Sequence, residues 1–324
     1  MPRALPRPHL RPSSLLVFSV LLCGLVLAAL LAMTIGAAGI PLQRLIAALG
    51  LGSDISGMLA RDQLVLWSIR IPRIAVAAMI GALLAVSGTI MQGLFRNPLA
   101  DPALVGVSSG GAFAAAVAIV LSDSAWGVHL KFLQGQMLPL FAFAGSLLTT
   151  MILYRIASRN GRTSVALFLL AGLAIAALAN AGIGLLVFMA DDRQLRDITF
   201  WLLGSISGAT WTKGLSIAPI ALVSRGLDVL ALGGAEAFHS GVNVERLKKI
   251  SIVMVSAMTG AAVSICGVIG FVGIVVPHLL RLMIGPGHRM LLPASAFLGA
   301  ILLIGADPLA RVLAFRRLQR DMER

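Results

Sequence analysis

Charged residues, and acidic ones above all, are scarce in this sequence. Only 12% of the 324 residues are charged, and Asp and Glu together number 13 against 26 Lys and Arg. The three glutamates, Glu236, Glu245 and Glu323, all lie outside the long apolar runs. A carrier that couples transport to protons or ions usually keeps ionisable groups inside its helical bundle. This scarcity argues against a self-sufficient secondary transporter.

Residues and motifs that would hold a metal or a nucleotide are also missing. The two cysteines, Cys23 and Cys266, lie within apolar runs, where we expect packing residues and not a disulfide or metal pair. The five histidines form no i, i+4 pair, and no G-x-x-x-x-G-K-[ST] loop is present. We therefore expect no catalytic residue, metal or bound cofactor, and any uphill transport would use ATP and Mg²⁺ in a separate subunit.

Apolar residues, in contrast, make up 58% of the chain, and its mean hydropathy is +0.96. A soluble domain cannot bury so much apolar surface, and repeated runs near the ~20 residues that cross a bilayer indicate a helical membrane protein. We predict an all-α polytopic bundle forming a single transmembrane domain over residues 1–324. Its roughly nine expected spans are 15–35, 65–94, 103–121, 133–155, 164–189, 200–223, 250–267, 268–285 and 290–306.

The net charge of +13 comes from Lys and Arg scattered through short loops. No basic face interleaved with aromatic residues is present, so we expect no nucleic-acid binding. In membrane proteins such an excess is typical of cytoplasmic loops. The first apolar run follows a basic lead and is longer than the ~7–15 apolar residues of a signal peptide. We expect an uncleaved first helix in a lipid bilayer, with the N terminus in the cytoplasm.

A weak internal repeat relates residues 79–90 to residues 258–269. Because an odd number of expected spans separates the two copies, their directions in the membrane would be opposite. Inverted repeats of this kind are typical of transporters.

Two polar segments interrupt the apolar pattern. Residues 95–113 carry Arg, Asn, Asp and two prolines between two apolar runs. Residues 224–249 form an amphipathic connection with a double glycine and a basic end, too polar to span a membrane. Proline disfavours helix in the residue before it, and irregular backbone at membrane depth is tolerated only beside protein or water. The first segment is therefore expected beside protein or a water-filled space.

Together the motifs resemble the FecCD-type permeases of ABC importers, a family that moves iron–siderophore complexes, haem or vitamin B12. The resemblance covers residues 14–311. It rests on RIPR, NPLADP, a GSISGATW stretch, an LALGGAEAF stretch, PHLLR and ADPLAR, found within 70–73, 81–112, 200–211, 230–242, 267–285 and 288–311.

This resemblance implies a permease subunit of the cell inner membrane that works by alternating access. Its expected partners are a second permease copy or paralogue, two ATP-binding subunits and a periplasmic substrate-binding protein. Which chelate is carried, and whether the dimer is of one chain or two, stay open.

The resemblance also implies roles for the two polar segments. Asn97 and Leu99 would lie at a cytoplasmic gate, although a plain helix–turn–helix capped by the asparagine is the alternative. The 224–249 connection would be the coupling loop that docks on the ATP-binding subunit, and a loop on the solvent or membrane surface is the alternative. The matching coupling residues are Leu232, Gly233, Gly234, Ala235, Glu236 and Val242.

Three arginines match family positions that meet glutamates of the binding protein: Arg70, Arg73 and Arg311. A guanidinium suits this role because it pairs with a carboxylate through two hydrogen bonds. The alternative for Arg70 and Arg73 is anchoring of a helix end at the lipid interface. Gly204 and Ser205, followed by Trp211, match a family segment beside the translocation pathway. Close packing of helices would explain these small residues equally well.

The chain departs from the family after Arg311. Family members continue with a further apolar helix, giving ten spans, whereas residues 312–324 form a basic tail with four arginines. Such a segment cannot cross a bilayer. The sequence alone thus leaves open a truncated, non-transporting protein or an assembly partner.

Overall fold

The computed structural model describes the chain in ten segments: residues 13–35, 40–52, 57–95, 97–98, 100–102, 106–122, 136–159, 162–225, 244–285 and 287–322. The elements of the first half are α1 (Ser14–Thr34), α2 (Leu42–Ala48), α3 (Leu59–Val65), the π-helical η1 (Leu66–Arg70), α4 (Ile71–Phe95), α5 (Val107–Ser122) and α7 (Met137–Ala157). The second half contains β1 (Ser158–Arg159), β2 (Arg162–Thr163), α8 (Val165–Met189), α9 (Asp192–Leu202), α10 (Trp211–Arg225), α12 (Val244–Cys266), α13 (Val272–Ile284) and α14 (His288–Met322).

The predicted all-α polytopic class is confirmed. Apart from the two-residue strands β1 and β2, the regular elements of the described residues are helices. Within those residues, six helices are long and apolar enough to cross a membrane, and α5 and α13 are shorter apolar helices. The six are Ser14–Thr34, Leu59–Phe95, Met137–Ala157, Val165–Met189, Lys248–Cys266 and Arg289–Leu313. The first repeat segment, 79–90, lies in α4, and most of the second, 258–269, lies in α12, which packs against α4. Their inverted relation stays a prediction.

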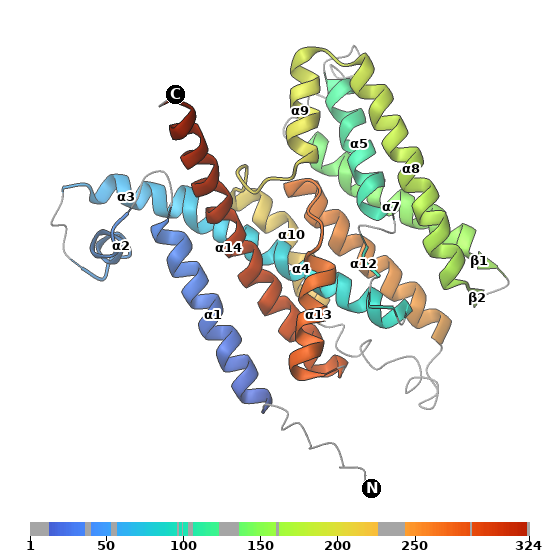
Figure 1. Cartoon of the computed structure of the whole chain (residues 1–324), viewed down its shortest axis with the longest axis horizontal. Helices are drawn as coiled ribbons and strands as arrows, with labels where there is room; N and C mark the ends of the chain where they lie inside the picture. The colour runs from blue at the N-terminus through green and yellow to red at the C-terminus, as the bar shows by residue number, and fades with distance from the viewer. Residues whose placement is uncertain are drawn as a thin grey trace, which may run out of the picture.

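Helix α4 lies at the centre of the bundle, where it packs against α10, α12, α13 and α14 (Figure 1). Small residues make these contacts close, because a Cβ built on Gly81 would overlap the carbonyl of Gly299 in α14. The same overlap holds in the opposite direction, so the two backbones touch at this crossing. Close approach through small residues is the usual way for helices to pack in a membrane, where lipid is as apolar as the side chains.

A second group of helices, α5, α7, α8 and α9, gathers beside α12 (Figure 1). Gly110 and Gly145 bring α5 and α7 together, since a Cβ on Gly145 would lie 2.6 Å from the Gly110 carbonyl oxygen. The hydroxyl of Thr150 in α7 lies 2.6 Å from that of Ser256 in α12, which joins the second group to the first.

The single span predicted over residues 200–223 is wrong. The structure ends α9 at Leu202 and begins α10 at Trp211, with non-helical residues between them. Gly204 has a φ of +70°, a left-handed conformation that ends a helix and that glycine adopts without strain. The Ser205 amide then donates to the Cys266 carbonyl at 2.7 Å, so the break is held by the end of α12.

The span predicted to end at 306 is also longer than expected. Helix α14 has 35 residues and continues through Arg311 to Met322, so the basic tail is helical up to that residue. The tail contains four Arg and two Leu, which favour helix whatever their polarity. A helix of that length measures about 52 Å, longer than the ~30 Å hydrocarbon core, so part of it must lie beyond the core.

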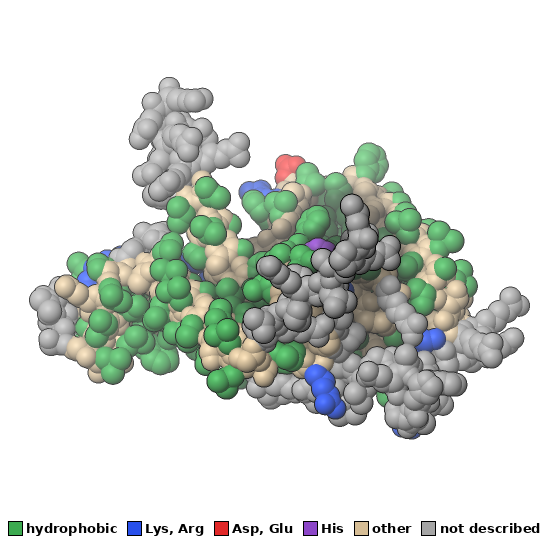
Figure 2. Space-filling model, turned by 60° about the horizontal axis from the view of Figure 1, so that its bottom comes forward, with side chains coloured by type: hydrophobic (Ala, Val, Ile, Leu, Met, Phe, Trp, Pro, Cys, Tyr) green, Lys and Arg blue, Asp and Glu red, His purple; other side chains and the backbone are tan. Residues whose placement is uncertain are grey.

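Apolar side chains cover much of the described surface in Figure 2. Helices α1 and α8 contribute strongly, with residues such as Leu15, Leu178 and Phe188 largely exposed. Surface of this extent is stable in contact with lipid or with another subunit, and not in water.

The Gly81–Gly299 crossing yields a matched test on one helix. Gly299→Ala should destabilise the folded chain, because the new methyl group would overlap Gly81 and Ala85. Gly305→Ala, also in α14, should be neutral or slightly stabilising, since no atom of the described residues outside its own stretch of helix lies within 4 Å of its Cβ position. Thermal unfolding of both variants in detergent measures the difference, and equal melting temperatures would contradict the close crossing.

Candidate functional site: the two polar ends of helix α4

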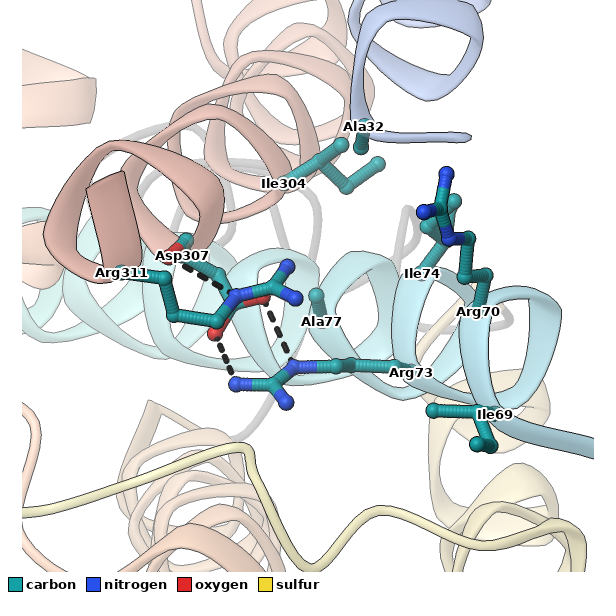
Figure 3. Close-up of a pocket in the computed structure, with 9 residues that line it drawn as sticks. All are labelled: Ala32, Ile69, Arg70, Arg73, Ile74, Ala77, Ile304, Asp307 and Arg311. Carbon is teal, nitrogen blue, oxygen red and sulfur yellow. Dashed lines mark hydrogen bonds and ion pairs between the residues drawn. The ribbon is translucent and has the colours of Figure 1, made fainter. Parts of the chain in front are cut away.

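An arginine–aspartate cluster occupies the N-terminal end of α4. The Arg73 guanidinium donates two hydrogen bonds to Asp307 of α14, Nε to Oδ2 at 2.8 Å and Nη2 to Oδ1 at 2.6 Å (Figure 3). Arg311, one turn further along α14, donates Nη2 to the same Oδ2 at 2.7 Å. One carboxylate therefore holds two guanidinium groups, a strong charge-assisted arrangement.

Arg70 lies apart from this ion pair although it lines the same space. Its side chain is buried and donates to the backbone carbonyl of Met33 at the end of α1, and Figure 3 shows it directed away from Asp307. Arg70 is the last residue of η1, whose wider π-turn changes the direction in which the side chain leaves the helix.

Together the three arginines line a small cavity of about 20 Å³, which is room for about one water molecule. The cavity wall carries three positive charges and the single negative charge of Asp307, a balance of 3 − 1 = +2. Of the three arginines, Arg311 is the most accessible, with 37% of its side chain exposed against 15% for Arg73. The arrangement can attract an anionic group, and a partner carboxylate would meet Arg311 first.

Asp307 is a functional candidate that the sequence reasoning missed as a partner of these arginines. The available signal was its position four residues before Arg311, the spacing at which opposite charges pair on one helix face. Its pairing with Arg73, 234 residues away, had no local signal.

The C-terminal end of α4 carries a second polar cluster, centred on Gln92. This residue is 2% exposed, and its amide Nε2 donates to the Gly273 carbonyl of α13 at 3.0 Å. Its Oε1 accepts from Nη1 of Arg281 at 2.5 Å. The backbone carbonyl of Gln92 accepts from the amide of Asn97 at 3.2 Å. The turn that contains the predicted gate residue Asn97 is therefore bonded directly to this cluster.

The gate and coupling predictions divide between described and undescribed residues. Asn97 is half-buried, and its carbonyl accepts from the amide of Ala100 at 3.1 Å, which makes a tight turn. Leu99 lies outside the described residues. So do all six predicted coupling residues, which fall within residues 226–243.

The predicted pathway residues lie in the break between α9 and α10. Gly204 packs against the Val268 carbonyl, to which an added Cβ would come within 2.6 Å. Ser205 is exposed, and its hydroxyl lies 2.7 Å from that of Ser207. Trp211 donates its indole N–H to the Trp67 carbonyl at 3.0 Å, which ties α10 to η1. The glycine thus has a packing role, whereas the serine faces open space.

Comparisons with known proteins agree on one relationship. The FecCD transport family matches residues 23–319. The hemin transport system permease protein HmuU of Yersinia pestis is 43% identical over 290 residues, which are 83% of this chain and 85% of that protein. The cobalamin import system permease protein BtuC of Halobacterium salinarum is 41% identical over 260 residues, 78% of this chain and 68% of that protein.

Among solved structures, an inward-facing conformation of a metal-chelate type ABC transporter is similar to this chain. The two have a TM-score of 0.76 and 31% sequence identity, with 93% of this chain and 92% of that one covered.

Removing the shared carboxylate tests the arginine cluster. Asp307→Asn would leave Arg73 and Arg311 facing each other without an anion, so we expect a lower melting temperature, equivalent to about 1–3 kcal/mol for a partly buried pair. Asp197→Asn is the control, because its contact with Arg193 is long, at 4.0 Å, and solvent-exposed. A loss of stability in the control but not in Asp307→Asn would contradict the assignment.

Proposed function

The chain belongs to the FecCD transport family, and from this membership we propose that it is the membrane-spanning permease subunit of an ATP-driven importer for haem, cobalamin or iron–siderophore chelates. The observation that carries the proposal is the family match over residues 23–319, joined to relatives that are permeases for hemin and cobalamin. The polytopic bundle with apolar outer faces supports a place in the inner membrane.

The proposed mechanism is alternating access powered by ATP hydrolysis in separate subunits. A second permease copy or paralogue would complete the pathway, and two ATP-binding subunits would dock on the 224–249 connection. The N terminus would be cytoplasmic, as the basic lead before α1 favours. ATP binding elsewhere would shift the populations of inward-open and outward-open states, provided that it binds one of them more tightly.

The proposed docking site for the substrate-binding protein is the arginine–aspartate cluster. Arg311 and Arg73 already bind a carboxylate in the structure, which supports their ability to accept one from a partner. A glutamate of the binding protein would share the guanidiniums with Asp307 or displace it. Because Arg70 is buried against Met33, its contribution would be to the charge of the site more than to direct contact.

The turn at Asn97 is proposed as part of the inner gate. It follows directly from α4, and its backbone leaves the helix beside α13. Irregular backbone at membrane depth is expected where it is protected by protein or lines a water-filled space. Gly204 and Ser205 are proposed to lie near the pathway, where the exposed Ser205 hydroxyl would contact water or cargo.

Reconstituted transport tests the function directly. The chain is placed in proteoliposomes with the ATP-binding subunits and the substrate-binding protein encoded with it, and uptake of hemin, cobalamin and a ferric siderophore is measured. ATP-dependent uptake of one chelate class is expected. A complex that assembles but moves none of them would favour the non-transporting alternative, and uptake without ATP-binding subunits would favour a secondary transporter.

Co-purification tests the coupling loop separately. We expect the ATP-binding subunit to be retained by the intact chain and lost when residues 228–249 are scrambled. Retention by the scrambled chain would assign the contact to another surface.

Charge reversal tests the docking site. Arg311→Glu should weaken binding of the substrate-binding protein at least about tenfold and reduce its dependence on salt, because one attractive ion pair becomes repulsive. Arg193→Glu is the matched control, since this arginine of α9 is exposed and lies outside the cluster. The affinity of the binding protein for each variant in nanodiscs is measured by biolayer interferometry. Equal losses of affinity in both variants would point to a non-specific charge effect.

A further inference from the structure

Gln92 is a buried side chain that connects α4 to α13 through hydrogen bonds at both ends of its amide. The Nε2 bond to Gly273 reaches the first turn of α13, and the Oε1 bond to Arg281 reaches its last turn. Burial of an amide is unfavourable unless its donors and acceptor are paired. The side chain therefore has a strong preference for one position, between the two ends of α13.

The backbone of the same residue holds the turn that follows α4. The Asn97 amide donates to the Gln92 carbonyl across five residues, a wider closure than the four-residue bond of an α-helix. The Ala100 amide then donates to the Asn97 carbonyl. One residue thus contacts α13 through its side chain and the Asn97 turn through its backbone.

The ends of α13 give it little support from the neighbouring chain. The helix begins after Phe271, whose backbone is left-handed with a φ of +68°, and ends at Gly285, which has a φ of +87° and a ψ of −177°, so the chain changes direction at each end. For Phe271, whose side chain is 75% exposed, this conformation is unfavourable. Because the chain bends at both ends, the position of α13 depends on its lateral contacts.

The lateral contacts converge on the same place. A Cβ on Gly88, one turn before Gln92, would overlap the backbone of Gly273, so the α4 and α13 backbones touch where the Gln92 amide bonds. A Cβ added to Gly273 would also lie 3.2 Å from Oδ1 of Asp101, a buried residue that follows the Asn97 turn. The first turn of α13 is thus close both to α4 and to the segment after the turn.

From this arrangement we propose that Gln92 is a positioning residue that couples the Asn97 turn to helix α13, so that the two move as one body. The inference rests on the proposed function and deepens it, because it names the helix whose displacement would move the inner gate. Arg281 is the second member of the coupling, since its guanidinium reaches back from the last turn of α13 to the same amide.

Only a side chain with both a donor and an acceptor can serve here. The Gly273 carbonyl requires a donor, and the Arg281 guanidinium requires an acceptor. Gln92→Met keeps the length of the side chain and removes both bonds. Gln92→Glu keeps the bond to Arg281 and loses the donor to Gly273, which separates the two contacts.

Hydrogen–deuterium exchange of the full chain in nanodiscs tests the coupling without a change in the turn itself. In Gln92→Met, peptides containing the amides of Asn97 and Ala100 should exchange about tenfold faster, a change that corresponds to about 1.4 kcal/mol of local stability. Arg281→Met, a change on α13 alone, should also accelerate exchange in the Asn97 turn. Gln92→Glu should do so less than Gln92→Met, because the Arg281 contact is retained.

Thr89→Val is the matched control. It removes a different buried hydrogen bond of α4, from the Thr89 hydroxyl to Ser295 of α14 at 2.9 Å, and leaves α13 untouched. Exchange in the Asn97 turn should not change in this variant. Unchanged exchange in Gln92→Met and Arg281→Met, or an equal increase in Thr89→Val, would overturn the coupling.

The outcome is distinct from that of the proposed function. If the wild-type chain transports a chelate but the exchange pattern does not respond, the coupling is wrong and the permease function stands. If exchange responds as expected but no chelate is moved, the coupling is a structural property of the fold and the proposed function fails.

Discussion

The structure depends on the packing of one helix, α4, at the centre of an apolar bundle. A buried helix in a membrane must pair its polar side chains within the protein, because lipid supplies no hydrogen bonds. The polar residues in the buried part of α4 meet this requirement. Ser87 bonds to the Leu84 carbonyl, Thr89 to Ser295, and Gln92 to Gly273 and Arg281. Glycines at the crossings let the neighbouring backbones come close enough for these bonds to form.

This arrangement places one charged cluster near each end of the same helix. Arg73 and Gln92 are 92 − 73 = 19 residues apart, about 28 Å along an α-helix. A central helix with a charged cluster at one end and a turn-holding cluster at the other is suited to the proposed permease, which must respond on two faces. In that proposal the two faces would meet the substrate-binding protein and the ATP-binding subunits.

Most of the fold was predictable from hydrophobicity, and many residues of the candidate site from motifs. Which polar residues of the site bond to one another was not predictable. The predicted span over 65–94 overlaps α4 almost completely, because a long apolar run has few alternatives to a spanning helix. The break at Gly204 was missed, since glycine is frequent in membrane helices and only its observed φ of +70° ends this one. The arginines of the docking prediction were chosen by their motifs. The burial of Arg70, the last residue of the π-helical η1, could not be predicted from the sequence.

The sequence by itself determined that this chain is an all-α membrane protein of the FecCD family, because composition, run length and local motifs are properties of neighbouring residues. Only the tertiary structure decided which polar groups meet. The carboxylate that holds Arg73 is 234 residues away, and the guanidinium that reaches Gln92 is 189 residues away. Hydropathy contains no information about such pairs. They are set by which helices cross, and the crossings are set by where two glycines allow two backbones to touch.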